Sequence, residues 1–107
     1  MKVTLITVTY NSSKYLEESF KSVIAQDYPN IEHIVVDGKS TDGTLDVIKK
    51  YQSHFAKWVS ETDRGMYDAI NKGMAMSTGD IIGVIHSDDV LASPDVISSI
   101  VKAFREQ

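Results

Sequence analysis

The sequence predicts an α/β fold: a Rossmann-like α/β/α domain of three layers with a mainly parallel sheet. Short apolar runs alternate along the chain with segments whose apolar residues recur at helical spacing. Polar or acidic clusters follow each of the four expected strands, and ligands of open parallel sheets bind beyond the carboxyl ends of the strands. This alternation implies right-handed crossovers, with helices covering the sheet.

The first half of the chain is expected to form two strand–helix units. Residues 3–10 mix β-branched residues without helical periodicity, as in a strand buried on both faces. Residues 11–13 offer capping groups for a helix to about Gln26. Residues 31–37 form the second strand, and residues 38–43 form a loop of turn-forming residues before the next helix. The apolar helix positions are Leu16, Phe20, Val23 and Ile24, then Leu45, Ile48 and Tyr51.

The second half is expected to repeat the pattern. Residues 56–60 form a short third strand, and the helix after it is capped at its carboxyl end by Gly79. Residues 81–85 form a fourth buried strand, and residues 93–95 start a last helix with proline in its first turn. The buried helix faces are expected to be Met66, Ile70, Gly73 and Met74, then Val96, Ile97, Ile100, Val101 and Phe104.

Size and charge narrow the class of protein. The 107 residues suffice for one domain, and the net charge of −4 argues against a nucleic-acid groove, which needs a dense basic face. The absence of cysteine fits a reducing compartment. The amino-terminal apolar stretch is too short for a membrane span and has no signal-peptide pattern. We therefore expect a cytoplasmic location, free or peripheral to the inner face of the membrane.

The most informative single segment is an acidic pair at the end of the fourth strand. No Walker A sequence and no Gly-x-Gly-x-x-Gly turn follow the first strand. Residues 83–89 instead read as a buried strand that delivers Asp88 and Asp89 to its carboxyl end. Mg²⁺ or Mn²⁺ takes one or two protein carboxylates and leaves positions for phosphate oxygens. The alternative reading is an aspartate pair that only caps a turn.

Four segments together carry a family resemblance: Thr9–Asn11, Val36–Gly38, Ser60–Gly73 and Ser87–Asp89. In order and spacing they resemble family 2 glycosyltransferases of the GT-A fold, enzymes that transfer sugars from nucleotide-diphosphate donors. The resemblance covers essentially the whole chain. The run DRGMYDAINKG at residues 63–73 closely resembles a stretch of bacterial members that build surface polysaccharides.

The resemblance implies roles for five residues. Tyr10 would lie against the nucleobase, and Asp37 would accept a hydrogen bond from its imide nitrogen, which favours a UDP-sugar. Arg64 would lie near the base or the diphosphate. Asp88 would lie near the ribose or the metal, and Asp89 would bind Mg²⁺ or Mn²⁺ directly.

The chain departs from the family pattern at the metal motif. An intact Asp-x-Asp is absent, because the aligned triplet is Ser87-Asp88-Asp89, preceded by His86 where other members carry an acid or an amide. The division of roles between the two aspartates therefore stays open.

Plainer roles compete with the functional ones. Asp37 is suited to capping the loop that follows it, Tyr10 and Tyr67 to packing half-buried, and His86 to a structural position. Local helix-surface pairs are expected at Asp68, Asn71 and Lys72. Ordinary surface positions are expected at His33, His54, Lys49 and Lys50.

The resemblance also implies an inverting transfer, which needs a carboxylate base for the acceptor hydroxyl. No such base is found in the chain. We therefore expect residues 1–107 to be a single nucleotide-sugar-binding domain, the donor half without its acceptor half. The glycan acceptor would be recognised by residues of the acceptor half. Exposed apolar faces at the missing half would favour homo-oligomers.

Two alternatives remain from other classes of function. The first is a donor-binding fragment without turnover. The second is a receiver-like signalling domain that binds Mg²⁺ through a carboxylate cluster. Receiver domains need an acidic pair after the first strand and haloacid-dehalogenase-type phosphatases a nucleophilic aspartate there, whereas this chain has Tyr10-Asn11. Glycosyl transfer is the favoured interpretation.

Overall fold

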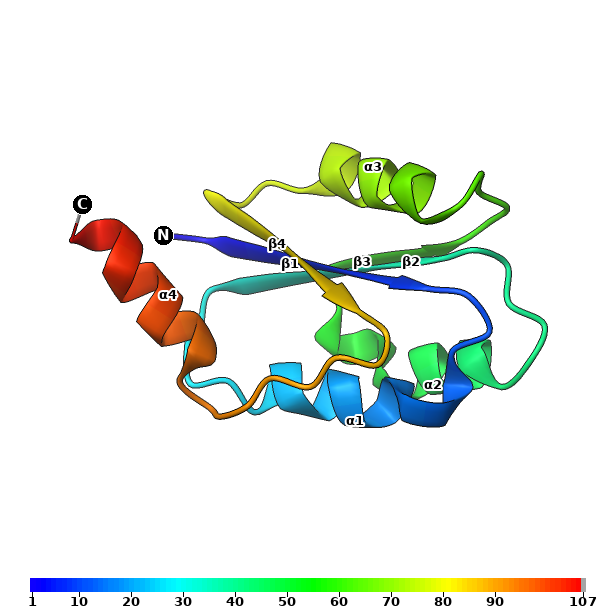
Figure 1. Cartoon of the computed structure of the whole chain (residues 1–107), viewed down its shortest axis with the longest axis horizontal. Helices are drawn as coiled ribbons and strands as arrows, with labels where there is room; N and C mark the ends of the chain where they lie inside the picture. Colours follow the sequence, from blue (N-terminus) through cyan, green and yellow to red (C-terminus); the bar gives the residue numbers. More distant parts are fainter. Residues whose placement is uncertain (107) are drawn as a thin grey trace.

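The computed structural model describes residues 1–106 and contains one parallel sheet of four strands in the order β3-β2-β1-β4. Helices α1 and α2 lie on one face of the sheet and α3 on the other (Figure 1). This arrangement confirms the predicted α/β class with three layers. The strands are β1 (Val3–Thr9), β2 (Ile31–Asp37), β3 (Lys57–Ser60) and β4 (Ile81–His86). The helices are α1 (Ser13–Ile24), α2 (Thr44–Tyr51), the 3-10 turn η1 (Gln52–His54), α3 (Met66–Met76) and α4 (Val96–Arg105).

The central strands β1 and β2 are buried along nearly their whole length, and besides their aliphatic and β-branched residues β2 also buries Glu32, His33 and Asp37. They pair in register from Val3 with Ile31 to Thr9 with Asp37. Because every pairing in the sheet is parallel, the loops after all four strands leave from one edge. The fold thus brings the four polar clusters of the sequence to that edge.

Helix α3 packs directly against β1 at a glycine, Gly73. A Cβ atom at Gly73 would stand 2.5 Å from Cγ2 of Ile6, which is too close for any real side chain. Ala69, one turn earlier, is also buried against the same cluster. Small residues therefore face the sheet, and the prediction that Met66 and Met74 belong to the buried face is wrong, since both are nearly half exposed.

Strand β4 differs from the prediction of a fully buried strand. It lies at the edge of the sheet, and α3 covers β1 and β2 instead. Ile82 and Val84 are consequently exposed. On α4 only Ile97 and Val101 are buried, while the predicted core positions Ile100 and Phe104 are exposed. Self-association through these surfaces stays a prediction. Within residues 1–106, no helix combines the length and apolar character needed to traverse a bilayer.

The segment between α3 and β4 is held by side chains of β1 and β2. Helix α3 ends at Met76, and Gly79 lies beyond its cap, so the predicted capping role of Gly79 is wrong. Gly79 instead donates its N–H to Oγ1 of Thr4, and a Cβ atom there would stand 2.7 Å from the backbone nitrogen of Thr4. Glu32 accepts hydrogen bonds from the amide and hydroxyl of Thr78 at 2.8 and 2.7 Å. Glycine is required at position 79 because the segment passes this close to the backbone of Thr4.

His33 was expected at the surface but is only 3% exposed. Its ring packs edge-on against Phe20 and Phe55, and its Nε2 lies 2.8 Å from Oγ1 of Thr7. The strand period places it on the face that α1 covers. Burial disfavours the imidazolium and lowers the pKa of His33 from 6.5 to about 4.

The free energy of unfolding is expected to fall by about 2 kcal/mol between pH 7.5 and pH 5 because of His33. The folded pKa is depressed, so the unfolded chain takes up a proton that the folded chain refuses. The contribution of neutral His33 to the free energy of unfolding is complete above about pH 6.5 and is lost as the pH falls toward 4. Urea titrations of the wild type and His33→Gln measure it. An equally steep pH dependence in the variant would contradict the assignment.

Candidate functional site

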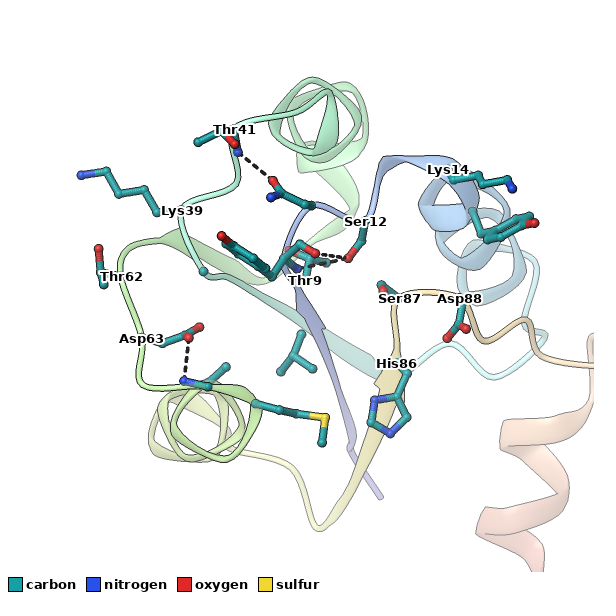
Figure 2. A pocket seen from close by; sticks show the side chains of 18 residues that line it. Thr9, Ser12, Lys14, Lys39, Thr41, Thr62, Asp63, His86, Ser87 and Asp88 are labelled. Carbon is teal, nitrogen blue, oxygen red and sulfur yellow. Dashed lines mark hydrogen bonds between the residues drawn. The ribbon is translucent and has the colours of Figure 1, made fainter.

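A pocket of about 1020 Å³ opens at the carboxyl edge of the sheet, a volume at the upper end of small-molecule sites. The loops after β1, β2 and β3 and the end of β4 all contribute to it. Figure 2 shows Thr62 and Asp63 on one side of the pocket and Ser87 and Asp88 on the other. Polar lining residues are Thr9, Asn11, Ser12, Lys14, Lys39, Thr41, Thr62, Asp63, His86, Ser87 and Asp88, and apolar or aromatic ones include Tyr10, Tyr15 and Met66.

Tyr10 follows β1 directly and is 65% exposed within this pocket. Its Cδ1 lies 3.3 Å from the position that a Cβ atom at Gly38 would occupy. The ring thus stands beside the loop after β2 with much of its surface free. An exposed aromatic ring in a pocket offers a stacking surface, so the packing role considered for Tyr10 is not what the structure shows.

Asn11 joins the loops after β1 and β2, a role that the sequence reading missed. Its φ of 46° is in the left-handed region, which asparagine tolerates better than most residues. In this conformation its Oδ1 accepts the N–H of Thr41 at 2.9 Å, and its own N–H donates to Oγ of Ser40 at 2.8 Å. The sequence signal for this role was the Tyr10-Asn11 pair at the end of the first strand, together with the loop of turn-forming residues after the second strand.

Asp37 lies beneath the pocket and does not line it. Its side chain is fully buried, and its two oxygens accept from the hydroxyls of Thr9, Ser40 and Ser60 and from the N–H of Ser40, at 2.6 to 2.9 Å. Burial opposes ionisation, but these hydrogen bonds outweigh it and hold the pKa of Asp37 below its usual value. The geometry favours the capping alternative, because Asp37 does not line the pocket and both of its oxygens already accept hydrogen bonds from the protein.

Asp63 lines the pocket, whereas Asp37 does not. Its Oδ1 accepts the N–H of Gly65 at 3.0 Å, and Gly65 has a φ of 111° that suits only glycine. Its Oδ2 lies 2.9 Å from the position of a Cβ atom at Gly38. No described hydrogen bond of residues 1–106 uses that oxygen. The sequence reading included Asp63 in the DRGMYDAINKG run without giving it a role.

Arg64 is exposed and lies outside the pocket lining. Its backbone N–H donates to Oδ2 of Asp68 at 2.9 Å. Lys72 donates to the carbonyl of Thr62 at 2.9 Å and pairs with Asp68 at 3.8 Å, which confirms the expected local pairing on α3. Tyr67 is 79% exposed, so the half-buried packing expected of it is wrong.

The two aspartates after β4 have different environments. Asp88 lines the pocket together with His86 and Ser87. Asp89 does not line it, and its Oδ2 accepts the N–H of His86 at 3.1 Å, as in a capped turn. His86 is exposed, so the structural role considered for it does not apply.

The donor set fits a metal that is shared with a ligand. No cluster of three or more histidine, cysteine, aspartate or glutamate residues exists among residues 1–106. Mg²⁺ and Mn²⁺ are often held by one or two carboxylates together with phosphate oxygens and water. Asp88 at the pocket wall suits that mode, whereas a cage made only of protein ligands is not present in the described part of the chain.

Comparison with known proteins identifies the family of the chain. The profile described as glycosyl transferase family 2 matches residues 4–107. A glycosyltransferase of Mycobacterium tuberculosis is 42% identical over 102 residues, which cover 94% of this chain. The poly(ribitol-phosphate) beta-N-acetylglucosaminyltransferase TarS of Staphylococcus aureus is 34% identical over 96 residues, which cover 85% of this chain and 17% of TarS.

Two solved structures superpose closely on the fold. TarS residues 1–349 in complex with UDP-GlcNAc gives a TM-score of 0.90 at 29% identity over 99% of this chain. The mannosyltransferase PcManGT of Pyrobaculum calidifontis, in complex with GDP-Man and Mn²⁺, gives 0.87 at 32% identity over 94% of this chain and 31% of its own. The sheet with its flanking helices is therefore the GT-A fold.

The chain spans only part of each of these proteins. It covers 39% of the Mycobacterium relative and 32% of the TarS 1–349 chain. The matched part contains the pocket and the loops around it.

Proposed function

The chain belongs to glycosyl transferase family 2, and we propose that it binds the nucleotide-diphosphate sugar donor of such an enzyme, with UDP as the nucleotide. The observation that carries this proposal is the pocket at the carboxyl edge of the sheet, which combines an exposed tyrosine, carboxylates on two sides and no competing phosphate loop. TarS, which resembles the whole chain, is solved with UDP-GlcNAc.

The geometry suggests an orientation for the nucleotide. The free surface of Tyr10 suits the planar base, and Asp88 lies across the pocket from Asp63 (Figure 2). A nucleotide stacked on Tyr10 would extend its diphosphate toward Asp88. Lys14 and Lys39 also line the pocket, and their ammonium groups reduce the repulsion between carboxylates and phosphates.

We assign the metal contact to Asp88. Asp88 faces the pocket, whereas Asp89 is engaged with the backbone of His86. A Mg²⁺ or Mn²⁺ ion bound there would neutralise charge on the departing diphosphate. Asp88 would orient the ion, and Asp89 would fix the turn that presents Asp88.

The whole transfer reaction is proposed for a protein that contains more than these residues. The pocket is lined by donor-binding groups, and no carboxylate is placed as base for an acceptor hydroxyl by any contact in residues 1–106. We propose that inversion at the sugar and the choice of glycan acceptor depend on residues other than those that line this pocket. Residues 1–107 on their own are expected to bind donor without turnover.

Calorimetric titration of the purified chain tests the proposed function. UDP with Mn²⁺ is expected to bind at least about tenfold more tightly than UDP with EDTA, because the ion joins Asp88 to the diphosphate. GDP serves as the control for the base. Binding of UDP that is indifferent to Mn²⁺ would contradict the metal assignment, and tighter binding of GDP would contradict the choice of UDP.

A further inference from the structure

We infer that Asp63 is the residue that selects the nucleobase, by accepting a hydrogen bond from its imide N–H. The inference rests on the proposed function, since it assumes that a nucleotide occupies the pocket. It specifies the base class: a base with an N–H donor at that edge, such as uracil, in preference to one with a bare ring nitrogen, such as cytosine.

The first observation is that a free carboxylate oxygen lies beside the stacking surface. Oδ2 of Asp63 and Cδ1 of Tyr10 both lie within 3.3 Å of the point where a side chain at Gly38 would begin. A base lying on the ring of Tyr10 therefore has its edge toward Oδ2. Gly38 leaves the space that the carboxylate of Asp63 occupies.

The second observation is that the carboxylate is held in place before any ligand arrives. The N–H of Gly65 donates to Oδ1 at 3.0 Å, and the positive φ of Gly65 sets the turn that directs this N–H. Among residues 1–106, no hydrogen bond or ion pair is found for Oδ2. A fixed acceptor with a free oxygen costs little conformational entropy on binding.

The third observation is that the competing carboxylate is fully engaged. Asp37 is completely buried, and four donors surround it. If Asp37 bound a nucleobase, it would have to give up hydrogen bonds that stabilise the fold. Asp63 is half-buried and lines the pocket, so it is available.

An ionised carboxylate distinguishes bases by their donors. It accepts from the imide N–H of uracil, but it faces the lone pair of the unprotonated ring nitrogen of cytosine and repels it. Thr62 and Lys39 also line this side of the pocket. Among the described lining residues, Asp63 is the one carboxylate on this side, and it supplies a fixed anionic acceptor.

Competition titrations with UDP and CDP in saturating Mn²⁺ test the inference. The wild type is expected to prefer UDP by about tenfold or more. In Asp63→Asn the amide oxygen still accepts from Gly65, while the amide N–H₂ donates to cytosine, so the preference should shrink by about tenfold. Asp46→Asn is the matched control, since Asp46 is an exposed acid on α2 outside the pocket.

A ligand-side measurement keeps the test independent of the variant's folding. N3-methyl-UDP lacks the imide donor and should bind the wild type about tenfold more weakly than UDP. An unchanged UDP-to-CDP ratio in folded Asp63→Asn, or equal binding of UDP and N3-methyl-UDP, overturns the inference and leaves the proposed function intact. A wild type that binds neither UDP nor CDP overturns both.

Discussion

Replacing Asp88 by asparagine is expected to weaken Mn²⁺-dependent UDP binding by about 100-fold, because the charged ligand to the ion is lost. The residual affinity should equal that of the wild type in EDTA. Asp88 lies at the pocket wall and faces away from the core, so the free energy of unfolding should change by less than about 0.5 kcal/mol. Calorimetry with and without Mn²⁺ measures the first effect, and urea unfolding measures the second.

The neighbouring aspartate provides the sharpest comparison. Asp89→Asn keeps an oxygen that can accept the N–H of His86, so Mn²⁺-dependent binding should fall by no more than about threefold. Asp46→Asn again controls for the loss of one negative charge. If Asp89→Asn is the more damaging variant, the metal contact belongs to Asp89, as the family resemblance alone implied.

Replacing Asp37 by alanine is expected to lower the free energy of unfolding by about 3 to 5 kcal/mol. The loss arises because three hydroxyls and one backbone N–H, now bonded to this carboxylate, would remain buried without an acceptor. Two of the donors come from neighbouring strands, Thr9 at the end of β1 and Ser60 at the end of β3. Asp37 therefore ties three strand ends together under the pocket.

Asp42→Ala is the control for that measurement. Asp42 also accepts hydrogen bonds in this loop, from Thr44 and Ser13, but it is exposed, so its loss should cost about 1 kcal/mol. A stable Asp37→Ala variant that has lost UDP binding would contradict the structural role and would support direct contact with the base. Urea unfolding and UDP titration of both variants separate the two outcomes.

The strands and helices were predictable from the sequence where the pattern of apolar residues along the chain determines which positions are buried. The β-branched run of β1 and the periodic segment of α1 correspond to elements within a few residues of their predicted ends. Exposure of Ile82, Val84 and Phe104 could not be foreseen, because it depends on which strand lies at the edge of the sheet. Periodicity identifies an apolar face but does not say what covers it.

The site was predictable in its location and less so in its individual residues. Parallel strands place their carboxyl ends together, which located Tyr10 and Asp88 correctly at one pocket. Asp37 ends β2 and Asp63 closely follows β3, and they precede a glycine by one and two residues, respectively. The two aspartates differ in the residues that surround them in the fold. Asp37 accepts hydrogen bonds from hydroxyls of adjacent strands, whereas the carboxylate of Asp63 lies in space that Gly38 leaves open.

The central claim is that a UDP–metal complex lies in the pocket between Tyr10 and Asp88. Amide NMR spectra of the chain with UDP and substoichiometric Mn²⁺ test it directly, because the paramagnetic ion broadens signals near it. We predict broadening centred on residues 86–89. Tyr10, Gly38 and Asp63 should also show chemical-shift changes, and the same changes should appear when UDP is added with diamagnetic Mg²⁺. Broadening centred away from residues 86–89, for example at the exposed Asp46 on α2, would contradict it.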